Sequence, residues 1–141
     1  MGTEIQNAGV TAMARGTIRL LDGTLIDASI RFSSEVDLSF VRESIARKAC
    51  TIFPHDKTVT TWTNPGRDHP GKSKLYGVGR MHVFVNDYPV GDFMRVIPDR
   101  TLRAVGADIV IGNGIMKPLG IHVHGGTVVI PRQTNPVSVI K

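Results

Sequence analysis

Residues 32–48 pass from a strand pattern to a helix pattern within a few positions, and this change limits the folds open to the chain. Phe32 ends an alternation of apolar and mostly polar side chains, which is typical of a strand with one buried face. The residues that follow it are short or polar: Ser33, Ser34 and Glu35. Asp37 can then cap a helix through Lys48, because apolar residues recur there at three- and four-residue spacing. The sequence therefore predicts a strand and a helix joined by one short polar turn.

Most other segments carry strand patterns. Residues 16–32 are predicted to form a β-hairpin around Asp22-Gly23, a strong two-residue turn signal. A second hairpin, of residues 121–124 and 127–130, is predicted around Gly125-Gly126. Between them we expect a turn at 86–91, a connector at 102–107, one helical turn after Asn113, and strands at 57–62, 74–86, 93–97 and 108–111. The expected fold is a mostly β, closed-barrel domain with one regular helix and one short C-terminal helix.

The composition is that of a single globular domain. Of 141 residues, 41% are hydrophobic and 21% are charged, which argues against disorder. No apolar run approaches the roughly 20 residues of a membrane-spanning helix, and residues 1–15 lack the apolar core of a signal peptide. Cys50 is the one cysteine, so no internal disulfide can form, and we expect a packed, inert thiol. These features predict an intracellular protein of the cytoplasm or nucleus, without a membrane partner.

Three motifs occur in the order and spacing of a known family. The start of that family's first helix is matched by residues 38–44, which read Leu-Ser-Phe-Val-Arg-Glu-Ser. Its apolar-apolar-Gly signature before a C-terminal helix is matched by residues 108–116, and residues 76–79 resemble its Gly-rich segment near the flap. From Gly16 to Pro131 the chain resembles a retropepsin-like aspartic protease, the kind encoded by retroviruses and retrotransposons. The helix start is similar to that of BEL/Pao-type elements.

The resemblance implies a division of the chain and a partner. Residues 16–131 correspond to the retropepsin-like domain, residues 1–15 to an N-terminal segment that offers a dimer strand, and residues 132–141 to a C-terminal strand or tail. Such proteins form homodimers in which terminal strands interleave, a role that falls here to Thr3–Met13 and Val137–Lys141. The implied dimer interface contains Ser34, Glu35, Val137, Val139 and Ile140.

The active-site motif of the family is degenerate in this chain. Its Asp, Thr or Ser, and Gly are replaced by Ser33, Ser34 and Glu35. In the family two copies of the Asp meet across a two-fold axis, share one proton and activate a water. Ser33 has no acidity near neutral pH, and no His or Lys of the motif can act as its base. Two Glu35 carboxylates facing each other would repel unless one is protonated or the region stays wet.

We therefore expect a catalytically inactive domain that serves as a homodimerisation and protein–protein interaction module, without a cofactor. In the family a flap covers the substrate groove, and its counterpart here is the polar loop near residues 63–71. The residues carried over to the flap and peptide groove are Trp62, Asn64, Pro65, Gly66, Arg67, Asp68 and His69. An extended peptide can bind such a groove by strand addition.

Two other functions stay open. The first is an active aspartic endopeptidase that uses Asp27, because residues 25–29 also resemble the active-site motif. If Asp27 is aligned with the catalytic Asp of the family, the helix start at Ser39-Phe40 comes too many residues after it. Ile30 and Arg31 then stand where the family has a small residue. The second is a basic small-barrel domain that binds nucleic acid, since the net charge is +5. The 17 Lys and Arg residues form no block, but one group of cations and aromatics could stack bases: Trp62, Arg67, Lys72, Lys74 and Tyr76.

No metal site is predicted. His122 and His124 fall two apart on a predicted strand, so their side chains share one face. No Cys-rich or carboxylate-rich motif lies near them in the sequence. An exposed strand face is the simpler interpretation of this pair.

Overall fold

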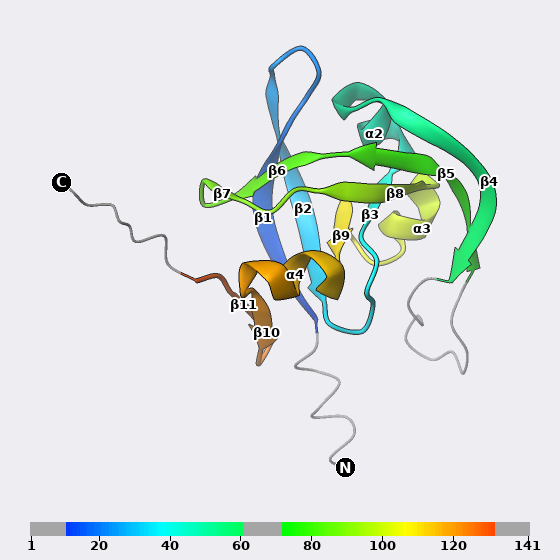
Figure 1. The fold of residues 1–141 in the computed structure, drawn as a ribbon. Coiled ribbons are helices and arrows are strands. Elements are labelled where there is room, and N and C mark those ends of the chain that lie inside the picture. Colours follow the sequence, from blue (N-terminus) through cyan, green and yellow to red (C-terminus); the bar gives the residue numbers. More distant parts are fainter. Residues whose placement is uncertain (1–10, 61–71, 132–141) are drawn as a thin grey trace.

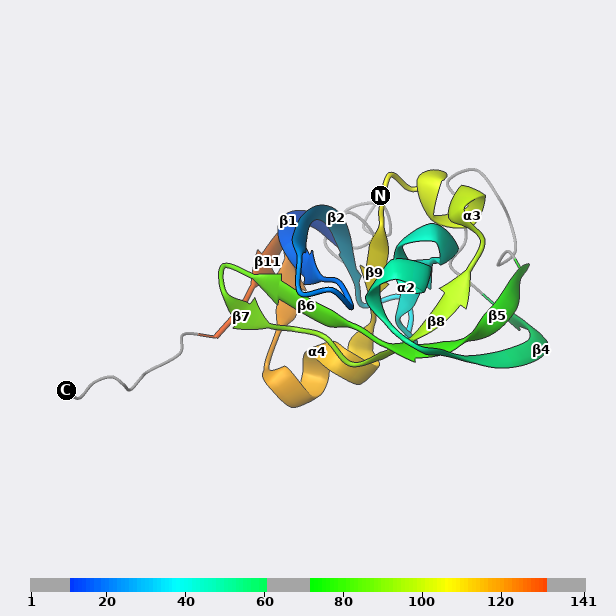
Figure 2. The ribbon, with the colours of Figure 1, turned by 90° about the horizontal axis from the view of Figure 1, so that it is seen from above.

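The computed structural model describes residues 11–60 and 72–131 as a curved β-sheet, a small hairpin and three short helices (Figures 1 and 2). Nine strands form the large sheet, in the order β4-β5-β8-β3-β9-β2-β1-β6-β7. These strands are β1 (Thr11–Arg19), β2 (Leu25–Ser33), β3 (Phe40–Arg42), β4 (Ile52–Thr60), β5 (Lys72–Arg80), β6 (His82–Val85), β7 (Tyr88–Pro89), β8 (Phe93–Ile97) and β9 (Ile109–Ile111). The remaining elements are α2 (Glu43–Ala49), α3 (Asp99–Arg103), α4 (Asn113–Leu119), β10 (His122–His124) and β11 (Thr127–Val129). The expectation of a mostly β fold is confirmed.

Strand β9 lies at the centre of the sheet. It pairs in parallel with β2 and antiparallel with β3, and β3 in turn pairs in parallel with β8. Figure 1 shows that β6 runs across β1, with which it pairs, and that β5 continues the line of β6 toward β4. The strand order ends at β4 and β7, and among the described strands no pair joins these two ends. The described pairs therefore do not form the closed barrel that the sequence predicted.

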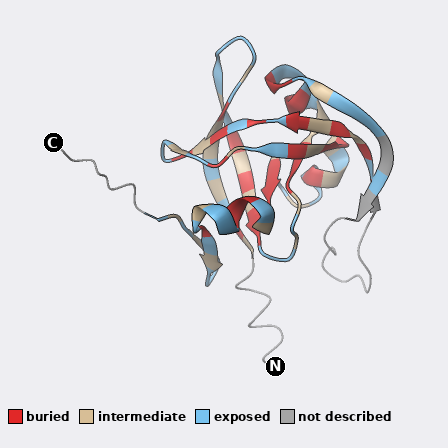
Figure 3. Ribbon diagram, viewed as in Figure 1, coloured by how far each residue is buried: buried red, intermediate tan, exposed pale blue. Residues whose placement is uncertain are grey.

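The main hydrophobic core lies on the inner side of this sheet, and α2 and α4 contribute to it (Figure 3). Its largest fully buried side chains include Ile18, Ile30, Phe32, Met81, Met94, Ile109, Ile111 and Met116. A second, smaller cluster forms around Leu102 of α3 and contains Phe40, Ile97, Ala107 and Val110. Alternate residues of β3 and β9 thus serve different clusters, because successive side chains of a strand point to opposite faces.

The helix predicted over residues 37–48 begins later than expected. Residues Phe40–Arg42 form β3 between β8 and β9, and α2 starts directly after them. The N-cap residue of α2 is the last residue of β3 rather than Asp37. Phe40 and Val41 are fully buried on opposite faces of the sheet, where aromatic and β-branched side chains favour a strand. Burial on both faces therefore outweighs the helical spacing of the sequence.

The strand predicted over residues 74–86 is divided at Met81 into β5 and β6. Strand β5 pairs with β4 and β8, whereas β6 pairs with β1 and β7. The Met81 backbone N–H donates to the Asp92 carbonyl oxygen at 3.0 Å, which bridges the break. Side chains alternate without interruption from Ser73 to Val85, buried at odd positions and at least partly exposed at even ones. One continuous sequence pattern thus serves two parts of the sheet.

The connector predicted at residues 102–107 begins inside a helix that the sequence did not indicate. This helix, α3, follows Pro98 and carries the fully buried Leu102. Likewise α4 extends from Asn113 to Leu119 and is longer than the single turn expected, and Gly112 rather than Asn113 is its N-cap residue. The prediction of one regular and one short helix was wrong, because the described residues contain three short helices.

The predicted hairpins are confirmed, with small changes of boundary. Strand β1 already begins at Thr11 and pairs with β2 along its length, and β7 lies inside the turn predicted at 86–91. The turn between β10 and β11 is made by Gly125 and Gly126, whose φ angles of 59° and 78° suit a two-residue hairpin. Residues 57–60 of the strand predicted at 57–62 belong to the longer β4, and residues 61 and 62 lie outside the described residues.

Candidate functional site

The turn after β2, residues 33–39, is the candidate site because it carries the degenerate motif. Ser33 ends β2 and is buried, whereas Ser34 and Glu35 are exposed. The next strand, β3, begins at Phe40 and returns the chain to the sheet. The three motif residues thus lie together at the end of a core strand, in a turn between two strands rather than between a strand and a helix.

The turn is held against the link between β9 and α4 by hydrogen bonds. Asn113 donates twice, from its side-chain Nδ2 to the Ser34 carbonyl oxygen and from its backbone N–H to the Val36 carbonyl oxygen, both at 2.9 Å. The Gly114 N–H donates to the Asp37 carbonyl oxygen at 2.9 Å. These bonds fix the backbone of the turn, whose Val36 and Leu38 also pack against the smaller hydrophobic cluster.

A buried hydrogen bond and a close backbone approach complete this contact. The Gly112 N–H donates to the Ser39 hydroxyl oxygen at 2.9 Å, and both residues are buried. A Cβ atom at Gly112 would lie 2.7 Å from the Val36 carbonyl oxygen and still closer to that of Leu38. Position 112 therefore requires glycine for space, not for an unusual backbone conformation. Sequence reasoning found Gly112 and Ser39 only as parts of motifs and missed that they touch.

The chemistry available at the turn is limited. The Ser33 hydroxyl oxygen accepts a hydrogen bond from the Glu35 N–H at 3.2 Å, which closes a local turn. Within the described residues this hydroxyl has no imidazole or amine partner that could act as a base. The carboxylates of the turn belong to Glu35 and Asp37, and both residues are exposed. The described turn therefore offers no buried carboxylate, and its buried Ser33 hydroxyl has no base beside it.

Asp27, the alternative catalytic residue, lies away from this turn. It is in the middle of β2, exposed, and directly opposite Thr17 of β1. A surface hollow of about 240 Å³ lies beside it and is also lined by Arg15, Phe84 and Asp87. Asp27 therefore occupies a regular strand position between two paired strands, not a turn.

A network around Arg42 links five elements, and it was not predicted from the sequence. The Arg42 guanidinium donates from Nε to the Asp108 carboxylate at 2.8 Å and from Nη1 to the Asp99 carboxylate at 3.0 Å. Asp108 also accepts from the Ser29 N–H at 2.8 Å. Asp99 accepts from the Ser44 N–H at 2.9 Å and from the Ser44 hydroxyl at 2.6 Å. The network thereby ties β2, β3 with α2, α3 and the start of β9 together.

The carboxyl group of Asp99 shows the electrostatic effect of this network. Partial burial raises the pKa of Asp99, but hydrogen bonds from Ser44 and the positive charge of Arg42 together outweigh it. The pKa of Asp99 is therefore lower than its ordinary value. The sequence signal for such a network is weak, because its charged members are far apart in the chain.

Several predicted site residues lie outside the described residues. They are Trp62, Asn64, Pro65, Gly66, Arg67, Asp68 and His69 of the expected flap, and Val137, Val139 and Ile140 of the expected dimer strand. His122 and His124 are exposed on β10, and the described residues contain no group of three or more His, Cys, Asp or Glu placed to hold a metal ion. In the same part of the chain, no helix has the length and apolar character needed to cross a membrane.

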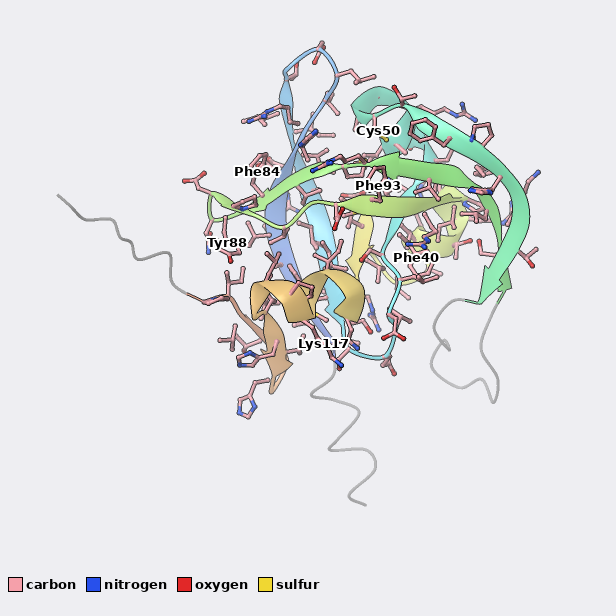
Figure 4. The ribbon with its side chains drawn as sticks, in the orientation of Figure 1. Phe40, Cys50, Phe84, Tyr88, Phe93 and Lys117 are labelled. Carbon is pink, nitrogen blue, oxygen red and sulfur yellow. The ribbon has the colours of Figure 1, made fainter. Side chains whose placement is uncertain are left out.

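Cys50 lies at the end of α2 and is buried (Figure 4). Burial raises the pKa of its thiol above the ordinary value, because a thiolate would lose its hydration there. The Sγ atom donates to the Ala46 carbonyl oxygen at 3.5 Å. These observations agree with the packed, inert thiol that the sequence predicted.

Comparison with known proteins adds little to this geometry. No protein-family model matches the chain, and no curated protein matches it. Among solved structures, the EIAV protease complexed with the inhibitor HBY-793 is similar, with a TM-score of 0.43 and 9% identity over 77% of this chain and 88% of that chain. A likeness of this strength supports no conclusion about family or activity. The retropepsin resemblance therefore depends on the sequence motifs and on the turn described above.

Proposed function

We propose that this chain is a catalytically inactive, retropepsin-like domain of the BEL/Pao type that acts as a homodimerisation and peptide-binding module. The observation that carries the proposal is the turn after β2, where Ser33 is buried and hydrogen-bonded to the Glu35 N–H. An aspartic protease needs a close pair of carboxylates that share one proton. The single free thiol, Cys50, agrees with an intracellular location.

The absence of protease activity is tested directly. The chain is incubated with an unstructured protein substrate at about pH 4 to 6, with and without a pepstatin-like inhibitor. We expect no inhibitor-sensitive cleavage, and no change on the substitution Asp27→Asn. Cleavage that the inhibitor blocks and that Asp27→Asn abolishes would establish the active endopeptidase instead.

The homodimer is tested by mass and by charge. Sedimentation equilibrium should give twice the chain mass of 15.3 kDa at micromolar concentration. If two Glu35 carboxylates approach each other across the dimer axis, Glu35→Gln should tighten the dimer severalfold at neutral pH, because a repulsive pair is removed. The matched control is Asp87→Asn, which also removes one exposed negative charge but lies in the β6–β7 turn. A monomer at all concentrations contradicts the dimer, and equal effects of the two variants contradict the Glu35 contact.

Peptide binding is tested separately from dimerisation. Extended peptides add to a sheet edge through backbone hydrogen bonds, so their binding should slow amide exchange along the contacted strand. Among the described strands, β4 has one neighbour, β5. Slower exchange in β4 on addition of a peptide library fraction supports the module, and unchanged exchange across the chain contradicts it.

A further inference from the structure

The outward side of β5 and β6 carries an unusual sequence of side chains. The two strands follow one another across the molecule (Figure 1). Their even-numbered residues are at least partly exposed, and of these Tyr76 also packs against the main core. We name this line the β5–β6 stripe; its members are Lys74, Tyr76, Val78, Arg80, His82 and Phe84. It contains three basic or titratable groups, Lys74, Arg80 and His82, interspersed with two aromatic residues and a valine. If extended, ten residue steps of strand would span about 33 Å.

Neighbouring strands add aromatic and cationic groups beside the stripe. Phe93 of β8 pairs directly with Arg80 of β5, and Arg19 of β1 pairs directly with His82 of β6. Phe53 of β4 is paired with Val78 and is 59% exposed, and Phe93 is 45% exposed. Figure 4 shows Phe84 and Phe93 on the strands that cross the front of the molecule. Phe53 and Phe93 thus expose large apolar surface to solvent, and such surface often marks a binding site.

Cations lie over rings at three places along the stripe. The Arg80 guanidinium lies 5.7 Å from the centre of the Phe93 ring, and the Lys74 ammonium lies 5.3 Å from that of Tyr76. Arg19 lies 5.2 Å from the ring centre of Phe84. Such pairs hold positive charge beside flat, exposed surfaces. Phosphates are attracted by the charges, and nucleobases stack on rings and on guanidinium planes.

The stripe also has a hollow beside it. The hollow has a volume of about 480 Å³, and its exposed apolar and basic lining includes Leu21, Phe53, Phe93, Arg19 and Arg80. No Asp or Glu lines this hollow. The carboxylate of Asp92 is close to Phe93, since it accepts a hydrogen bond from the Phe93 backbone N–H. The local charge is therefore positive, in the same sense as the net charge of +5.

We infer that the β5–β6 stripe binds single-stranded nucleic acid without strong sequence preference. A sheet face with exposed rings and cations side by side gives a base platform and a phosphate track together, which is the combination that such proteins use. An acidic peptide would satisfy the charges but would not need flat surfaces beside them. The inference does not rest on the proposed dimer or peptide groove, because it is argued from described residues of β5, β6 and their paired strands alone.

The test measures binding of the full chain to a fluorescent oligothymidylate of about 16 nucleotides. Fluorescence anisotropy gives the affinity at several salt concentrations. We expect binding that weakens as salt rises. Arg80→Gln should weaken binding and reduce the slope of log affinity against log salt by about 0.7, the value for one phosphate contact on a single strand. Phe93→Ala should weaken binding about tenfold, in the range of one stacked base, with little change of slope.

The matched control is Lys117→Gln, which removes one positive charge from α4, on another part of the molecule (Figure 4). We expect it to leave affinity and slope nearly unchanged. Circular dichroism of each variant shows that it is folded, and Arg80 and Phe93 are exposed enough to be replaced without loss of core. Absence of binding at low salt overturns the inference. So does an equal effect of Arg80→Gln and Lys117→Gln, or a polyglutamate peptide that binds as tightly as the oligonucleotide.

Discussion

The side-chain amide of Asn113 donates a hydrogen bond to the Ser34 carbonyl oxygen at 2.9 Å, although the two residues are far apart in the chain. This bond joins the start of α4 to the turn that carries the degenerate motif. It holds the turn, together with the packing of Val36 and Leu38 against the smaller hydrophobic cluster. The conformation of residues 33–37 therefore depends on a residue about 80 positions later in the sequence, Asn113.

Removing this amide should loosen the turn. We expect Asn113→Ala and Asn113→Asp each to lower the free energy of unfolding by about 1 kcal/mol, because both lose the donor to Ser34. Asp keeps the size of Asn and favours a first helical turn, so a loss in both variants cannot come from helix propensity. Chemical denaturation measures the change, and hydrogen exchange should show faster exchange at Ser34 and Glu35. Unchanged exchange there would contradict the role of the bond.

The close approach at Gly112 gives a larger effect. Gly112→Ala should lower the free energy of unfolding by about 3 kcal/mol, because the new Cβ would meet the carbonyl oxygens of Val36 and Leu38. Gly23→Ala is the control, since Gly23 has a φ of 88° but open space where the alanine methyl group would lie. Backbone strain alone should cost about 1 kcal/mol there. Equal losses in the two variants would show that space at position 112 is not limiting.

The Arg42 network predicts a pH dependence. The pKa of Asp99 is lowered in the folded chain, so ionised Asp99 stabilises the fold above its unfolded pKa of about 3.9. This stabilisation is lost as the pH falls through the lower, folded value. We expect Asp99→Asn to cost about 1 to 2 kcal/mol at neutral pH and progressively less as the pH falls below about 4.

Thermal melts of the wild type and of Asp99→Asn over that pH range measure the difference. Glu43→Gln is a suitable control, because Glu43 pairs with Arg47 on the surface of α2 and is not part of the network. Its cost should be smaller, below about 1 kcal/mol. A constant difference between wild type and Asp99→Asn at all pH values would contradict the lowered pKa.

Cys50 should react slowly in the folded chain. Burial raises the pKa of the thiol and shields it, so alkylation by iodoacetamide at about pH 8 should be more than tenfold slower than in denaturant. The chain has a single cysteine, so the total rate reports on this site alone. Equal rates in the folded and unfolded states would contradict the packed environment.

The sequence predicted the hairpins well, because turn chemistry and alternation act locally. Gly125 and Gly126 form the turn expected of them, and the β1–β2 hairpin turns at Asp22-Gly23. The sequence failed where partners come from distant segments. Val41 fits a helical spacing, but Phe40 and Val41 form a strand because β8 and β9 lie on either side of them. No local rule contains that information.

For the candidate site too, the sequence predicted the local arrangement but not the tertiary contacts. The motif positions Ser33, Ser34 and Glu35 do lie together in one turn after a core strand, as expected. The contacts that fix the turn were not predicted, because Gly112 and Asn113 meet it only through tertiary packing. The exposed stripe was missed for another reason. Its alternation was visible, but only the strand pairs place Phe93 and Arg19 beside it.

The central place of β9 has a consequence for how this protein is made. In the strand order, β9 alone connects the block β2-β1-β6-β7 to the block β4-β5-β8-β3. A nascent chain on the ribosome cannot form the strand pairs of β9 with β2 and β3 until residues 109–111 have left the exit tunnel. Completion of the sheet must therefore wait for nearly the whole described chain to be synthesised, and contacts between such distant segments form slowly. Until then, the facing edges of β2 and β3 are exposed to chaperones and to other unfinished chains.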